Sequence, residues 1–150
     1  MNRLAEVGGL LKKIYRIYSH DVLTMLQSRG FLDLRPSFLE ILMYLSETPE
    51  ATIKSIGIYC DLKKQTMTSH LNELETRGYI HRKPGLKDRR EMIVTLTEYG
   101  EKFKFAMHEC IKELEADYFK QMGNVELDRI QLILEKLYTE VRKEKQQDLL

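Results

Sequence analysis

Apolar side chains recur at three- and four-residue steps over six stretches of the chain, which is the spacing of helices that bury one face. Residues that start or stop helices punctuate these stretches. Gly30 and Gly78 each follow a stretch, and Pro36 begins another. The predicted helices cover residues 10–30, 36–48, 53–62, 64–77, 98–121 and 126–145. The chain is therefore predicted to be mainly α-helical.

The middle of the chain has the pattern of strands. β-branched and aromatic residues predict one strand over residues 79–83 and another over 92–96, and Pro84-Gly85 opens a charged loop between them. Residues 51–53 predict a third, very short strand. The resulting order is that of a helix-turn-helix followed by a β-hairpin wing.

The predicted fold is mainly α with a small β-hairpin wing, in a single domain over residues 1–150. A winged helix-turn-helix lobe occupies about residues 36–100, and helices at about 10–33 and 101–147 flank it. These outer helices carry apolar stripes that the small central lobe of one chain cannot cover. We therefore expect a two-fold symmetric homodimer in which the first and last helices serve dimerisation.

Composition and charge narrow the functional classes. The 150 residues are 43% hydrophobic and 31% charged, as in globular proteins, and contain no run of eighteen apolar residues. The N-terminus has no signal-peptide pattern, so we expect a cytoplasmic protein.

The net charge is only +1, but residues 79–90 hold five cations and one acid. That segment carries +4 and the remainder −3, which concentrates the positive charge on the predicted hairpin.

Short motifs follow one another in order across residues 62–103. They are Lys64-Gln65-Thr66-Met67-Thr68, Leu74-Glu75-Thr76-Arg77-Gly78-Tyr79-Ile80, Arg82-Lys83-Pro84, Asp88-Arg89-Arg90 and Val94-Thr95-Leu96-Thr97-Glu98-Tyr99-Gly100. In this order and spacing they resemble the MarR family of bacterial regulators, whose pattern includes L-E-x-x-G, D-x-R and L-T-x-x-G. The chain departs from the family at Lys63, where a capping serine is usual, and at Ser69, where arginine is common.

The start of the fourth predicted helix has the residues that a DNA-reading helix needs. Short polar side chains and one cation can contact base edges and phosphates in the major groove. These predicted recognition residues are Lys64, Gln65, Thr66, Thr68 and Ser69. Met67, Leu71 and Leu74 have the opposite phase and would hold the helix on its lobe.

The basic hairpin suits the negative potential of the minor groove and the phosphates beside it. The predicted wing and phosphate contacts are Arg82, Lys83, Lys87, Arg89 and Arg90. The resemblance assigns the minor-groove contact to Arg90 and a wing-stabilising role to Asp88. It implies a sequence-specific regulator of double-stranded DNA, most simply a homodimeric repressor at a palindromic operator. Activation is the alternative mode.

Small-molecule release is a further implication of the resemblance, with a pocket between the outer helices and the DNA-binding lobe. The candidate pocket residues are Tyr15, Tyr18, Phe38, Tyr44, Phe105 and His108, which the same spacing also allows as plain core. We expect no cofactor and no metal site.

Other functions remain as alternatives. A metal-responsive regulator would draw on the loosely placed His20, Glu40, His108 and Glu109, and a redox-responsive one on Cys60 or Cys110. A winged helix that binds protein is a third alternative, although such modules tend to lack a basic wing. An enzyme is not expected, because the phosphate-cradling, zinc-protease and serine-hydrolase motifs are missing.

Overall fold

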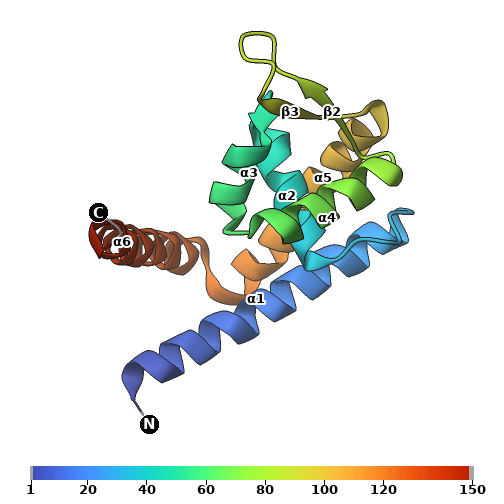
Figure 1. Ribbon diagram of the computed structural model, residues 1–150. Coiled ribbons are helices and arrows are strands. Elements are labelled where there is room, and N and C mark those ends of the chain that lie inside the picture. Colours follow the sequence, from blue (N-terminus) through green and yellow to red (C-terminus); the bar gives the residue numbers. More distant parts are fainter. Residues whose placement is uncertain (1, 149–150) are drawn as a thin grey trace. The chain divides into compact units, whose positions relative to one another are not determined.

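The computed structural model describes residues 2–148, with the burial of side chains described over residues 2–143. Two compact units form, unit 1 over Met1–Ile111 and unit 2 over Lys112–Leu150. The elements in chain order are α1 (Arg3–Ser28), α2 (Pro36–Glu47), β1 (Ala51–Thr52), α3 (Ile53–Cys60), α4 (Lys64–Thr76), β2 (Ile80–Pro84), β3 (Met92–Leu96), α5 (Glu98–Met122) and α6 (Asn124–Asp148) (Figure 1). The prediction of a mainly helical fold with a small β-wing is confirmed.

Some element ends differ from the prediction. The first helix begins at Arg3 rather than near residue 10, and its interior contains Gly8 and Gly9. Glycine is a weak helix former and hid this first part of the helix in the sequence pattern. β2 begins at Ile80 because the Tyr79 amide donates to the Leu74 carbonyl (2.9 Å) in the turn that ends α4.

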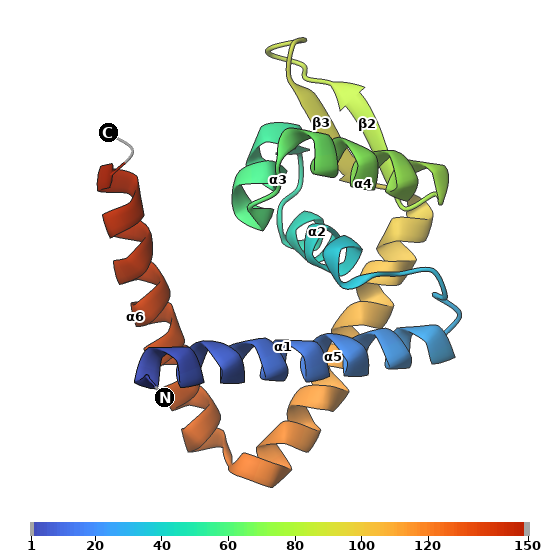
Figure 2. The same cartoon turned by 60° about the horizontal axis from the view of Figure 1, so that its bottom comes forward.

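The sheet has the strand order β1-β3-β2, with both pairings antiparallel. Val94 lies at its centre, opposite Ala51 on one side and Arg82 on the other, and it is completely buried. The hairpin formed by β2 and β3 extends from unit 1 on the side away from α1 (Figures 1 and 2). The wing is thus built on a strand pair that is anchored in the core.

The core of unit 1 fixes which face of α4 is left outside. Its largest fully buried side chains are Val22, Leu26, Phe38, Ile41, Leu42, Ile56, Leu71, Leu74, Ile80, Val94, Phe103 and Met107. On α4, Met67, Leu71 and Leu74 are buried, as their phase predicted. Lys64, Gln65, Thr66, Thr68, Ser69 and Asn72 are therefore exposed on the outward face, whereas His70 is half-buried with its ring 5.2 Å from that of Phe38.

Thr97 joins the end of α4 to the start of α5. Its hydroxyl donates to the Gly78 carbonyl and accepts from the Gly100 amide (2.9 Å), while its own amide donates to the Tyr79 carbonyl (3.0 Å). Thr97 therefore caps the N-terminus of α5. The close approach of these segments explains the glycine at position 100.

Gly100→Ala should destabilise the protein by about 1–3 kcal/mol, the usual range for overpacking. A Cβ at this position would stand 2.2 Å from the Tyr79 carbonyl oxygen and 3.1 Å from the Leu96 Cβ. Gly9→Ala is the matched control, since nothing lies within 4 Å of the place that its methyl group would take, and alanine should add about 0.5–1 kcal/mol of helix stability. Urea unfolding compares the two, and equal stability would contradict the packing at residue 100.

Candidate DNA-binding site

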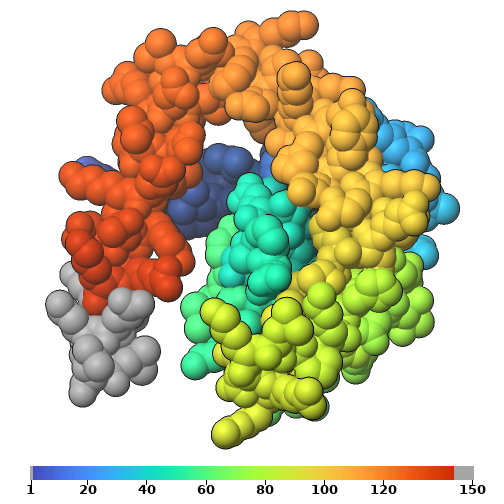
Figure 3. Space-filling model, turned by 90° about the horizontal axis from the view of Figure 1, so that it is seen from above, coloured from blue at the N-terminus to red at the C-terminus, as the bar shows by residue number. Residues whose placement is uncertain are grey.

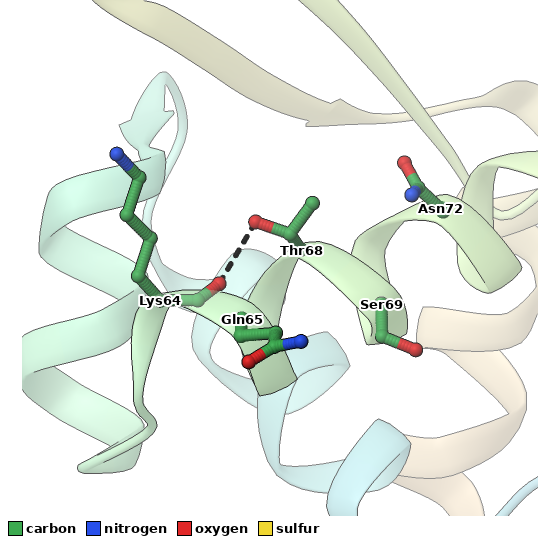
Figure 4. Close-up of a pocket in the computed structure, with 5 residues that line it drawn as sticks. All are labelled: Lys64, Gln65, Thr68, Ser69 and Asn72. Atoms are coloured by element: carbon green, nitrogen blue, oxygen red, sulfur yellow. Dashed lines mark hydrogen bonds between the residues drawn. The ribbon is translucent and has the colours of Figure 1, made fainter.

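The outward face of α4 presents a row of polar side chains. Lys64, Gln65, Thr68, Ser69 and Asn72 line one open hollow on the surface (Figure 4). Four of them are predicted recognition residues, and the fifth predicted residue, Thr66, is also exposed. Asn72 was not predicted, although its spacing of four residues from Thr68 could have identified it. The hollow offers hydrogen-bond donors and acceptors on a rigid helix.

The first turn of α4 has an unusual cap. The N-cap residue is Lys63, whose side chain forms no capping hydrogen bond, and Asp61 closes the preceding helix in the left-handed conformation (φ 52°). The partial positive charge of a helix N-terminus attracts anions such as phosphate groups. Lys63 and Lys64 add full positive charge at the same end.

The loop of the wing has a defined turn with its charges on the outside. The Gly85 amide donates to the Glu91 carbonyl (2.8 Å), and the Glu91 amide donates to the Asp88 carbonyl (3.2 Å). The Asp88 carboxylate accepts from the Arg90 amide (3.0 Å), an interaction that stabilises the turn. Lys87, Arg89 and Arg90 are exposed, and 95% of the Arg90 side chain is accessible. The hairpin forms a projection in the space-filling view (Figure 3).

Arg82 differs from the other predicted wing cations, because other residues of the chain hold its guanidinium. Its Nε donates to Glu75 Oε2 (2.9 Å), and its Nη2 donates to Asn72 Oδ1 (2.7 Å). The hydrogen bond from Arg82 is the largest cause of a lowered pKa at Glu75. Lys83, the next residue, is exposed. The structure thus ties β2 to α4 through Arg82.

The structure does not gather the six candidate effector residues into one described cavity. Phe38 is completely buried, with the Arg35 guanidinium 4.3 Å from the centre of its ring. Tyr44 stacks on Tyr59 with ring centres 4.5 Å apart, while Phe105 is 66% exposed. The remaining three are Tyr15 and Tyr18, whose rings lie 6.4 Å apart, and the exposed His108.

Metal-binding and redox chemistry gain little support from the described side chains. Over that part of the chain, no three His, Cys, Asp or Glu residues come together as a candidate metal site. Both cysteines are buried and unbridged. Burial, followed by the charge of Glu40, raises the pKa of the Cys60 thiol to about 12. A thiol of this kind is protonated at neutral pH and is a poor nucleophile.

Cys60 should therefore react with Ellman's reagent at pH 8 roughly 10³-fold more slowly than free cysteine, because its thiolate is scarce. The test uses a Cys110→Ala variant, in which Cys60 is the one remaining cysteine. Urea-unfolded protein of the same variant is the control and should react at the rate of a free thiol. Rapid reaction of the native protein would instead support redox regulation through Cys60.

Two long helices carry exposed apolar side chains. On α1 the exposed large hydrophobic residues are Leu4, Val7, Leu10, Leu11, Ile14, Tyr15 and Ile17. On α6 they are Val125, Ile130, Leu132, Ile133, Leu134, Leu137, Tyr138 and Val141. Exposed apolar surface of this extent is typical of a protein–protein interface. No helix among the described residues has the length and apolar character needed to cross a membrane.

Known proteins are similar to this chain in sequence and in fold. The model of the MarR family matches residues 34–92. The HTH-type transcriptional regulator SarZ of Staphylococcus haemolyticus (strain JCSC1435) is 34% identical over 68 residues, which are 45% of this chain and 46% of that protein. The match therefore spans less than half the length of this curated relative.

Solved structures share the fold over nearly the whole chain. A MarR transcriptional regulator from Methanosarcina mazei Go1 superposes with a TM-score of 0.79 at 23% identity, covering 93% of this chain and 98% of the other. MarR itself superposes with a TM-score of 0.73 at 22% identity, covering 91% and 98%. At these identities the structures establish the winged-helix fold.

Proposed function

We propose that this chain, which has the winged-helix fold and matches the MarR family model over residues 34–92, is a member of that family and a homodimeric, sequence-specific DNA-binding transcriptional regulator. Repression at a palindromic operator is the mode that we favour. The proposal rests on a hydrogen bond between β2 of the wing and α4, the two elements that we expect to contact DNA. Arg82 on β2 contacts Asn72 on α4 (2.7 Å), so the cationic hairpin and the polar helix face adjoin in one unit.

The proposed complex places α4 in the major groove. Gln65, Thr68 and Ser69 are exposed on a helix that is held from behind by buried residues, and they have the groups that read base edges. Lys64 and the N-terminus of α4 would meet phosphates. The wing would follow the backbone into the adjacent minor groove, where the exposed Arg90 meets the strongest negative potential.

The exposed apolar residues of α1 and α6 support the proposed dimer. Two copies would cover these surfaces and present two α4 helices to half-sites about 10 base pairs apart. An operator with two-fold symmetry is then expected. We propose no enzymatic activity and no resident cofactor. Release by a small molecule remains part of the proposal, with the pocket formed or completed in the dimer.

Selection from a library of random DNA duplexes tests the proposal. The expected result is an imperfect palindrome with half-site centres about 10 base pairs apart, bound at least about 10³-fold more tightly than scrambled DNA. Recovery of a single, asymmetric half-site would contradict recognition of the operator by a symmetric dimer. Failure to enrich any sequence would contradict specific DNA binding and make a protein-binding winged helix the leading alternative.

A further inference from the structure

We infer that Asn72 reads a base in each half-site as a hydrogen-bond donor only, because Arg82 holds its amide oxygen. The inference rests on the proposed function and adds a specificity-determining residue to it. Asn72 is exposed, lines the same hollow as Gln65 and Ser69, and lies beyond the motif residues at the start of the helix.

Three contacts fix the orientation of the Asn72 amide. Arg82 Nη2 donates to Asn72 Oδ1 at 2.7 Å. The same guanidinium is anchored on Glu75, with its Nε 2.9 Å from Oε2 and its Nη2 3.4 Å from Oε1. Only 22% of the Arg82 side chain is accessible, compared with 95% for Arg90. Arg82 is therefore a positioning residue rather than a freely extended cation.

The chemistry of the guanidinium determines which amide atom faces it. Arginine has donors and no acceptor, so the atom that contacts it must be the carbonyl oxygen of Asn72. The oxygen therefore faces Arg82, which leaves the NH2 group outside that contact. Figure 4 shows Asn72 on α4, along the helix from Thr68 and Ser69. What Asn72 offers to DNA is a pair of N–H donors.

This orientation changes the expected base preference. Asparagine usually pairs with adenine through one donor and one acceptor directed at the same base edge. With its oxygen turned to Arg82, Asn72 cannot direct both groups at one edge. It should prefer guanine, which presents two acceptors at N7 and O6, or thymine through O4, over adenine, whose N7 acceptor stands beside the N6 amino donor.

A structural role for Asn72, as a mere link between α4 and β2, would leave base preference unchanged. The test therefore compares full base-preference profiles, obtained by library selection, for four proteins: wild type, Asn72→Ala, Arg82→Met with Glu75→Gln, and the triple variant. Glu75→Gln avoids leaving an unpaired carboxylate. Thr76→Ala, an exposed change one turn further along α4, is the matched control, and circular dichroism checks folding.

Asn72→Ala should weaken binding about 2- to 10-fold per half-site, the effect of one hydrogen bond, and should abolish the guanine or thymine preference at one base pair. The double variant frees the amide and should shift that preference toward adenine. The triple variant should lose the shift, and Thr76→Ala should retain the wild-type profile.

An unchanged profile for Asn72→Ala would overturn the inference while leaving the proposed function intact, since the wild type would still select a palindrome. A uniform loss of affinity without a change in preference would also overturn it, because it indicates contact with phosphate. If the wild type itself selects no sequence, both the inference and the proposed function fail. The selection with the wild-type protein therefore distinguishes failure of the Asn72 inference from failure of the proposed function.

Discussion

Replacing Arg89 and Arg90 by alanine should lower the affinity for the operator about 10³-fold at about 0.1 M salt and flatten the salt dependence. Both side chains are exposed on the wing, and Arg90 makes only a loose approach to Asp88 (3.9 Å). A dimer would lose four cations, so the slope of log K against log salt should fall by about 3–4. Fluorescence anisotropy at several salt concentrations measures both quantities.

The control for this variant removes the same charge elsewhere in unit 1. Lys12 and Lys13 are exposed on α1, which lies on the side of unit 1 away from the hairpin (Figure 1). Lys12→Ala with Lys13→Ala should leave the salt slope within about one unit of wild type. Equal losses in both double variants would indicate a general effect of net charge and would contradict a specific role for the wing.

Leu137→Glu should dissociate the dimer. Leu137 is 42% exposed in the single chain and shares a helical stripe with Ile130, Leu134 and Val141 on α6. Losing the burial of one leucine costs about 1.5–3 kcal/mol, and a symmetric dimer loses it twice. The dimer dissociation constant should therefore rise about 10²- to 10⁴-fold, with a parallel loss of operator affinity. Light scattering coupled to size-exclusion chromatography measures the mass.

Leu86→Glu is the matched control for oligomeric state, because it makes the same chemical change at a leucine that is 94% exposed in the wing loop. It should remain dimeric. If Leu137→Glu also stays dimeric at micromolar concentration, α6 does not supply the interface. A wild-type protein that is itself monomeric would contradict the dimer altogether.

The elements could be predicted because their ends carry strong local signals. Pro36 begins α2, Gly78 follows the end of α4, and Thr97 caps α5, each through a preference that acts within a few residues. The start of α1 was missed because Gly8 and Gly9 weaken the local helix signal although the apolar stripe continues to Leu4. Local sequence signals therefore predicted where each element lies, but they did not predict the start of a helix whose first turns contain glycine.

The candidate site was predictable in part for the same reason. The outward face of α4 follows from the phase of Met67, Leu71 and Leu74. The contact between Arg82 and Asn72 could not be predicted, because it depends on how β2 docks beside α4. Sequence position alone made Arg82 look equivalent to Arg90, yet their exposures differ greatly.

Specific DNA binding is tested by fluorescence anisotropy with the duplex recovered by selection and a scrambled duplex of equal length, titrated at several salt concentrations. We expect one dimer to bind each palindrome at least about 10³-fold more tightly than scrambled DNA, with an affinity that falls steeply as salt rises. Equal affinity for both duplexes, or no binding to either at low salt, would contradict the claim that this protein is a sequence-specific DNA-binding regulator.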